Sequence, residues 1–246
     1  MPDQAEGPLD VEWFDVAAGE RFEPHTHPKH LLTWAASGSL TLEVENRCWV
    51  LPPSVALWIP AGMVHDAVAM RPSRLGGLYV ETDASPVAWS APTVVALTPL
   101  ALHLMDYLEG GDVSGPAWER ATAVLIDVLA PLEADDLELP LPVDRRGRAV
   151  ADLLRADPRE PRGADELAAE VGCSPRTLLR IFLAETGMTF SDWRSHLRIL
   201  AATAMVRDGL PVATVADLVG YATPSAFVSA FRRITGRTPR MVAYEK

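Results

Sequence analysis

The sequence predicts a two-domain β + α protein, in which an antiparallel β-barrel or sandwich and the helices after it precede an all-α domain. Three observations favour this fold class. The spacing of apolar residues changes along the chain from short alternations to a helical period, a proline-rich acidic segment interrupts the chain, and the C-terminal half contains an internal repeat. The chain has 246 residues, of which 48% are apolar, so it is long enough for two buried cores.

The N-terminal part is typical of short strands. Residues 11–80 are rich in valine, leucine and tryptophan, and residues 40–45 (LTLEVE) alternate apolar and polar side chains. Proline and glycine recur about every 8–12 residues, the turn spacing of a barrel or sandwich. Trp34, Trp49 and Trp58 fit either the core of this domain or the wall of a ligand pocket.

Two amphipathic helices should follow, over residues 97–108 and 118–132, because apolar residues recur there at intervals of three and four. Their apolar stripes consist of Leu100, Leu104 and Leu108, and of Val124, Val128 and Leu132. These stripes fit packing against the barrel or dimerisation equally well.

Residues 133–143 (EADDLELPLPV) hold four acids and two prolines, which indicates an interdomain linker. The charge also changes here. Residues 1–142 carry 6 basic and 21 acidic side chains, a net charge of −15, and residues 143–246 carry 16 and 12, a net charge of +4. This asymmetry suggests different partners for the two halves, with a polyanion for the basic one.

Several classes of protein are excluded. No run of about 18 apolar residues predicts a membrane span, and the acidic N-terminus lacks the apolar region of a secretory signal. Cys48 and Cys173 are too few for a disulfide framework or a CxxC zinc site, and we interpret both as small buried side chains. We expect a cytoplasmic protein.

The repeat predicts two helix-turn-helix motifs. Residues 167–172 align with 215–220, and each copy continues to a hydroxyl residue before proline, then to a phenylalanine and a glycine. Gly172 and Gly220 suit the left-handed end of a first helix. Ser174 and Thr223 suit the N-cap of the second helix, in which Leu178, Phe182, Phe227 and Phe231 would face inward.

The C-terminal half resembles the AraC/XylS family of bacterial transcription regulators over about 100 residues, 144–244. The stretch from Leu197 to Ala202 is similar to the linker helix of that family, which we expect over residues 190–206. Gly220-Tyr221, Phe227, Phe231-Arg232-Arg233, Gly236, Thr238 and Pro239 match its second motif. The resemblance implies that both recognition helices enter successive major-groove segments of double-stranded promoter DNA, about 34 Å apart.

The two recognition helices differ chemically. The first offers Arg176 and Arg180, and an arginine can bond guanine through two hydrogen bonds, so we expect it to supply most base readout. The second offers hydroxyl groups near an arginine pair suited to phosphates, so we expect it to anchor. The candidate DNA-binding residues are Ser174, Arg176, Thr177, Arg180, Thr223, Ser225, Ser229, Arg232 and Arg233.

Histidines form the second candidate site. His25 and His27 would project to the same face of a strand, and His65 follows a Pro-Ala-Gly-Met-Val turn. Three imidazoles can hold a divalent transition metal: zinc, nickel, iron or manganese. The segments resemble the two histidine motifs of the cupin superfamily and of AraC-type sensor domains built on it, but Leu31 stands where the cupin glutamate ligand would be.

Three roles therefore remain open for these histidines: a metal site, hydrogen-bond donors to a small-molecule effector, or structural hydrogen bonds within the barrel. Nearby, Arg47 suits either an anionic ligand or a solvated turn.

We predict an AraC-type transcription regulator, not an enzyme, with a cupin-like sensor barrel (residues 1–90), helices that pack on it and can dimerise the chain (91–132), a linker (133–143) and a DNA-binding domain (144–246). Dimerisation is implied by the resemblance. The alternative is a cupin metalloenzyme with a helical accessory domain. It lacks the expected carboxylate, and no P-loop or GxGxxG motif offers other chemistry.

Overall fold

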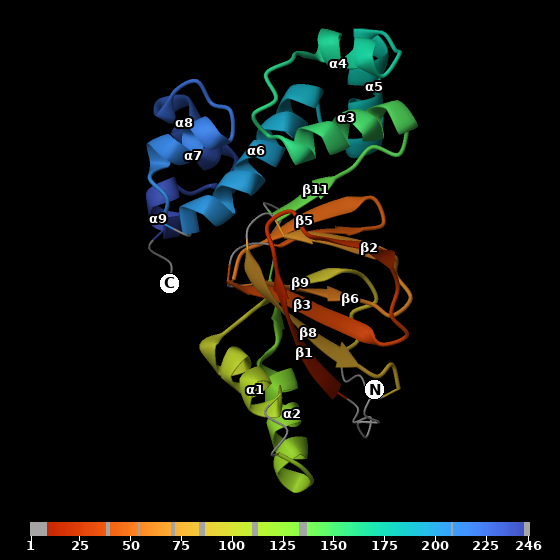
Figure 1. Ribbon diagram of the computed structural model, residues 1–246, viewed down its shortest axis with the longest axis vertical. Coiled ribbons are helices and arrows are strands. Elements are labelled where there is room, and N and C mark those ends of the chain that lie inside the picture. Colours follow the sequence, from red (N-terminus) through yellow and green to blue (C-terminus); the bar gives the residue numbers. More distant parts are fainter. Residues whose placement is uncertain are drawn as a thin grey trace. The chain divides into compact units, whose positions relative to one another are not determined.

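The computed structural model describes residues 9–37, 40–53, 55–69, 72–83, 87–109, 113–132, 137–207 and 209–243 (Figure 1). The chain forms two compact units. The first unit comprises Met1–Glu45 and Leu51–Ala134, and the second comprises Asn46–Val50 and Asp135–Lys246. Among the described helices, none is both long and apolar enough to cross a membrane.

The first unit contains the expected antiparallel strands. Six of them form one sheet in the order β1-β8-β3-β6-β9-β10, and every neighbouring pair is antiparallel. These strands are β1 (Leu9–Val16), β8 (Ser73–Val80), β3 (His30–Ser37), β6 (Val55–Ile59), β9 (Thr93–Ala96) and β10 (Ala130–Pro131). Facing strands come from β4 (Leu40–Val44), β7 (His65–Ala69) and β2 (Arg21–His25), in which β7 pairs with both others.

Tryptophans fill the core of the first unit. Trp34 and Trp58 are fully buried, so they belong to the core and not to a pocket wall. Gly76 leaves the space that Trp34 occupies, because a Cβ at this glycine would lie 2.2 Å from Cζ2 of the indole. The glycine in the middle of β8 is therefore a packing requirement.

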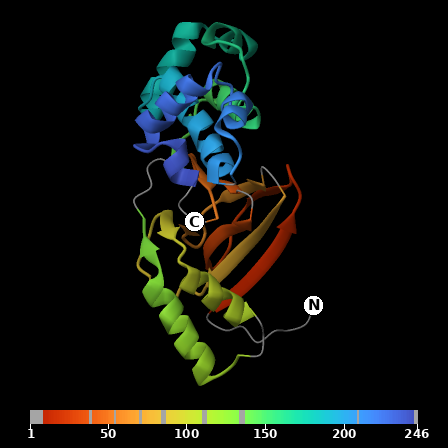
Figure 2. The same ribbon diagram turned by 90° about the vertical axis from the view of Figure 1, so that its left-hand side faces the viewer.

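The two helices of the first unit are α1 (Pro99–Glu109) and α2 (Pro116–Val128). They lie together at one end of the strands in both views (Figures 1 and 2). Their buried sides consist of Ala101, Met105, Leu108, Ala121 and Leu125, which join the tryptophan core.

The apolar stripes expected for these helices lie only partly on the buried side. Leu108 is buried, and Leu104 and Val128 pack against the core, but Leu100, Val124 and Leu132 are exposed, at 51%, 43% and 41%. One alanine of each helix, Ala101 and Ala121, packs inward beside larger apolar residues, because small side chains let a helix approach its neighbours closely. The second helix also ends earlier than expected, at Val128, and Pro131 pairs in β10 because proline does not continue a helix.

The second unit is mainly helical. Its strands β5 (Arg47–Leu51) and β11 (Glu138–Pro140) pair antiparallel. Its helices are α3 (Arg145–Ala156), α4 (Ala164–Glu170), α5 (Pro175–Thr186), α6 (Phe190–Arg207), α7 (Val212–Leu218), α8 (Pro224–Thr235) and α9 (Pro239–Ala243).

The segment 133–143 is not an exposed linker where the structure describes it. Residues 133–136 lie outside the described residues, but Leu137, Leu139 and Leu141 are buried. The Trp193 indole Nε1 donates a hydrogen bond to the Pro140 carbonyl at 2.7 Å. The acids and prolines of this segment obscure an alternation of leucines, of which Leu139 is the buried residue of β11 and Leu137 and Leu141 flank that strand.

The second unit has two hydrophobic cores, and helix α6 contributes residues to both. Trp193 and Leu197 pack with α3, α4 and α5, whereas Ile199 and Val206 pack with α7, α8 and α9. Figure 1 shows α6 between these two groups of helices. The expected linker helix, over residues 190–206, is thus confirmed, and the two helical groups share it.

Candidate functional site

The first helix-turn-helix consists of α4 and α5. Gly172 ends the first helix with a φ of 70°, in the left-handed region that favours glycine. Ser174 is the N-cap of α5, and its Oγ accepts a hydrogen bond from the Thr177 backbone N–H at 3.2 Å. The turn chemistry expected from the sequence is therefore present.

The second motif, α7 and α8, repeats these features. Gly220 has a φ of 79°, and the Thr223 Oγ1 accepts from the Ala226 backbone N–H at 3.2 Å. Phe227 and Phe231 are fully buried, as are Leu178 and Phe182 at the equivalent positions of α5. Both second helices thus fix one face inward and leave the other free.

The outward faces carry most of the candidate DNA-binding residues. Arg176 and Arg180 on α5 are exposed, and so are Ser225, Ser229 and Arg232 on α8, together with the two N-cap residues. Thr177 differs, because it is half-buried and its hydroxyl lies 2.9 Å from the Ser174 Oγ, within the cap.

Arg233 has a partner within the second unit. Its Nη1 lies 3.4 Å from Oδ1 of Asp192, on α6. A hydrogen bond from the Thr189 hydroxyl and the charge of Arg233 lower the pKa of Asp192, so this carboxylate stays ionised. The pair holds the end of α8 against α6, which the sequence did not indicate for Arg233.

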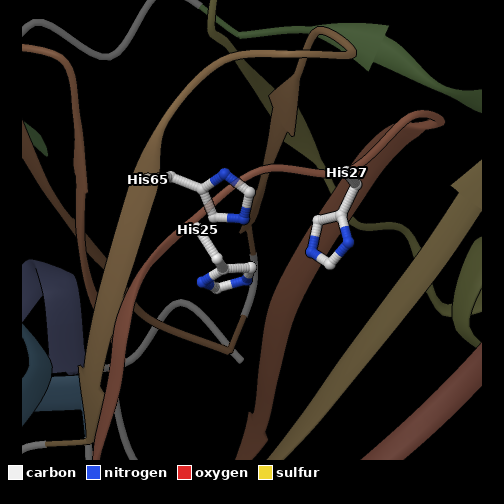
Figure 3. A group of neighbouring side chains, drawn as sticks. All are labelled: His25, His27 and His65. Atoms are coloured by element: carbon white, nitrogen blue, oxygen red, sulfur yellow. The ribbon is translucent and has the colours of Figure 1, made fainter.

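The second site is a cluster of His25, His27 and His65 in the first unit (Figure 3). His25 ends β2 and lies opposite His65, the first residue of β7, in the strand register. His27 lies just after β2, so it is not on the strand as expected, but its ring still faces the others. One ring nitrogen of each histidine lies within 4.8 Å of those of the other two.

Backbone carbonyls fix the tautomers of two of these imidazoles. Nδ1 of His65 donates to the Met63 carbonyl at 3.0 Å, and Nδ1 of His25 donates to the Glu23 carbonyl at 2.7 Å. A neutral ring that donates through Nδ1 keeps a lone pair on Nε2. For His65 this Nε2 is buried without a hydrogen-bond partner among the described residues, so it is available to a metal ion or to a ligand donor.

The surroundings favour the neutral form of two of these histidines, His65 and His27. Burial lowers the pKa of His65, and its backbone hydrogen bond to Met63 only partly opposes this effect. Burial also lowers the pKa of His27, and the neighbouring His65 and His25 lower it further. Neutral imidazoles are the form that binds metal ions.

The cluster forms the polar part of a cavity of about 230 Å³ within the first unit. Burial raises the pKa of Tyr79, another lining residue, to about 12, so its phenol stays protonated. Apolar side chains form most of the remaining wall: Phe14, Phe22, Leu31, Leu40, Leu42 and Leu75. Sequence reasoning missed Phe14, Phe22 and Tyr79, because only the strand register brings them to the histidines.

Other candidate residues lie elsewhere. Trp49 and Cys48 are buried in the second unit, whereas Cys173 is partly exposed. Arg47, the first residue of β5, is 60% exposed and forms an ion pair with Glu138, so its charge is solvated and already paired. Leu31 lines the histidine cavity, and there it supplies an apolar surface where a cupin carboxylate would stand.

Two families match the two halves of the chain. The family described as "AraC-like ligand binding domain" matches residues 15–99. The family described as "Helix-turn-helix domain" matches residues 167–243. The first range contains the histidine cavity, and the second contains both helix-turn-helix motifs.

Individual proteins are also similar to this chain. The HTH-type transcriptional regulator NimR of Escherichia coli K12 is 30% identical over 218 residues, which cover 87% of this chain and 80% of NimR. The HTH-type transcriptional regulator RipA of Corynebacterium glutamicum is 43% identical over 100 residues, 41% of this chain and 30% of RipA. Among solved structures, ToxT from Vibrio cholerae aligns over 97% of this chain and 98% of its own, with 10% identity and a TM-score of 0.41.

Proposed function

The chain belongs to the AraC family of transcription regulators, and from this premise we propose that its second unit binds promoter DNA through α5 and α8 while its first unit binds an effector. It is a regulator and not an enzyme, and none of the relatives named above supports the alternative of a cupin metalloenzyme. For the division of labour we keep residues 1–90 as the sensor barrel, 91–132 as its helices and 144–246 as the DNA-binding part, but we add β9 (Thr93–Ala96) to the barrel, and Asn46–Val50 and β11 (Glu138–Pro140) to the DNA-binding part.

The DNA proposal rests on one observation. Helices α5 and α8 are both capped, both leave an outer face exposed, and both pack against the same helix, α6. Exposed arginine and hydroxyl groups are suited to bases and phosphates in the major groove. Arg176 and Arg180 give α5 the base-reading role. We assign the phosphate contact of α8 to Arg232, because Arg233 already forms an ion pair with Asp192.

Footprinting on the region upstream of the chain's own gene, followed by titration of that duplex at several salt concentrations, tests this function. We expect a protected site and a steep loss of affinity as salt rises, because each phosphate contact releases counterions. Equal, salt-independent affinity for all duplexes, or no binding, would contradict a DNA-binding role.

The histidine cavity supports an effector of small size in the first unit. Its volume, about 230 Å³, is below the roughly 300–1,000 Å³ typical of pockets for drug-sized ligands. Apolar walls with imidazoles gathered on one side favour a compact apolar molecule that carries a single polar or metal-binding group.

A divalent metal ion fits the same histidines. His25, His27 and His65 would hold it through ring nitrogens, and a bound ion would supply a charge that polarises one group of the effector. The fit rests on the free Nε2 lone pairs and on the carbonyls that orient two of the rings.

Elemental analysis tests the metal. We expect the purified chain to contain a divalent transition metal, and the His25→Ala and His65→Ala variants to lose most of it, because two imidazoles seldom hold such an ion alone. His103→Ala is the matched control, since this exposed histidine lies on α1 of the same unit. Metal-free wild type that still binds an effector would leave the histidines as hydrogen-bonding groups.

A homodimer through α1 and α2 is the third part of the proposal. Leu100 and Tyr107 on α1 are each 51% exposed, and Val124 on α2 is 43% exposed. Exposed apolar side chains grouped on one pair of helices are typical of a protein interface.

Sedimentation velocity tests the dimer. We expect wild type to sediment as a dimer and the double variant Leu100→Glu, Val124→Glu to sediment as a monomer, because two buried carboxylates would oppose association. Leu179→Glu, which changes an exposed leucine of the second unit, is expected to remain dimeric. If both variants behave like wild type, the interface lies elsewhere.

A further inference from the structure

A second pocket lies within the second unit, beside α6. Its volume is about 440 Å³, and it is lined by Arg159, Pro161, Ser191, Arg194, Ser195, Arg198 and Gly220. Four of these residues, at positions 191, 194, 195 and 198, share one face of α6, because they recur at intervals of three and four. Three guanidinium groups and two hydroxyl groups therefore surround one hollow.

Arg194 is half-buried and only partly hydrogen-bonded. Its Nη1 donates to the Arg162 carbonyl at 2.7 Å, which fixes the direction of the side chain. Its Nε is buried with no acceptor among the described residues. A guanidinium whose direction is fixed in this way is suited to bind an anion in the pocket through its outer N–H groups.

Arg198, one turn later, is held just as firmly. Its Nε donates to the Pro158 carbonyl at 2.9 Å, and its guanidinium carbon lies 5.7 Å from the centre of the Tyr221 ring. Gly220 makes room for it, since a Cβ at this glycine would lie 2.8 Å from Nη2. The glycine in the turn that leads to α8 therefore allows the Arg198 guanidinium to occupy this position.

The nearby carboxylates are already engaged. Asp217 lies 3.4 Å from Arg159, and Glu160 lies 2.8 Å from Arg162, which lowers the pKa of Glu160 to about 2. Within the part of the chain that the structure describes, neither Arg194 nor Arg198 lies within ion-pair distance of a carboxylate. Burial lowers the pKa of both groups, and the charges of Glu160 near Arg194 and of Asp157 near Arg198 only partly oppose this effect.

We propose that this pocket binds a phosphate group, with Arg194 and Arg198 as its charged donors and Ser191 and Ser195 as its hydroxyl donors. Guanidinium groups match phosphate oxygens with paired hydrogen bonds. The pocket borders the segment that enters α4 and the turn that enters α8, next to both helix-turn-helix motifs. A backbone phosphate of bound DNA is one source of this group, and this source rests on the proposed function; a free phosphorylated molecule is the other.

The affinity for a random-sequence duplex, measured at several salt concentrations, tests whether the pocket binds a backbone phosphate of DNA. Loss of one phosphate contact lowers the slope of log affinity against log salt by about 0.9. For Arg194→Gln and Ser191→Asp we therefore expect the loss of affinity between about 50 and about 200 mM salt to shrink roughly 3.5-fold. Arg145→Gln, an exposed arginine of α3 with the same charge change, is expected to keep the wild-type slope.

Addition of inorganic phosphate to the same proteins tests whether the pocket binds a free phosphorylated molecule. We expect phosphate, compared with chloride at equal ionic strength, to raise the thermal unfolding midpoint of wild type and of Arg145→Gln but not of Arg194→Gln. A phosphate effect with unchanged DNA slopes would assign the pocket to a free phosphorylated ligand.

The DNA-binding function and the phosphate pocket can be contradicted independently of each other. If wild type binds no duplex but phosphate still stabilises it through Arg194, the DNA-binding function is wrong and the phosphate pocket stands. If Arg194→Gln and Ser191→Asp match wild type in both assays, or if Arg145→Gln changes as much as they do, the pocket proposal is wrong. Circular dichroism of each variant checks that it is folded.

Discussion

Replacing Trp193 with alanine is expected to lower the free energy of unfolding of the second unit by about 3–5 kcal/mol. Trp193 is fully buried, and its ring meets that of Phe182 edge-on with 5.0 Å between centroids. Alanine would leave a cavity between α5 and α6 and would also leave the Pro140 carbonyl without its donor. Denaturant unfolding of the full chain, followed by circular dichroism, measures the loss.

Trp193→Phe separates the two contributions. It keeps an aromatic ring in the cavity but removes the hydrogen bond to Pro140, so we expect a smaller loss, about 1–3 kcal/mol. Arg180→Ala, at an exposed position of α5, should change stability by less than about 0.5 kcal/mol. Equal stability of Trp193→Ala and Arg180→Ala would show that Trp193 does not support this core.

Replacing Arg176 with alanine is expected to cost about 1–3 kcal/mol of affinity for the operator, roughly a 5–150-fold weaker complex. Arg176 is exposed in the first turn of α5, directly after the Ser174 cap and Pro175. The start of a recognition helix lies closest to the base edges, where an arginine can bond guanine through two hydrogen bonds. Specificity should relax at one base pair, which binding to single-base operator variants measures.

Arg232→Ala is the matched control for Arg176→Ala. Arg232 is exposed on α8, where a phosphate contact is expected, so its loss should weaken operator and random DNA equally and reduce the salt slope by about 1. If Arg176→Ala shows the same uniform loss, then α5 positions the protein and base readout lies on another element.

The helical repeat was predictable because its signals are local. A glycine that ends a helix, a hydroxyl cap before proline, and two apolar residues four positions apart act within a single turn, so the sequence displays them directly. The structure confirms the glycines at 172 and 220 and both caps. The Arg233–Asp192 pair was not predictable, because 41 positions separate its members.

The histidine site was predictable in part for the same reason. Spacing brought His25 and His27 together, but only strand register joins Phe14, Phe22 and Tyr79 to them. The buried leucines 137, 139 and 141 were misjudged as part of a linker, because acids and prolines dominate that segment. The burial of Leu139 and Leu141 depends on Trp193 and on β5, both distant in sequence.

The second unit is discontinuous in sequence, since Asn46–Val50 belong to it although they precede most of the first unit. A gene fragment that starts at Asp144 would therefore encode all seven helices described for this unit, yet omit four side chains of its interior: Cys48, Val50, Leu139 and Leu141. A chimera with another regulator that is joined at this single position would lack the same four side chains. A chimera that keeps the unit whole needs three junctions, one on each side of the strand contributed by the earlier stretch of chain and one before Asp135.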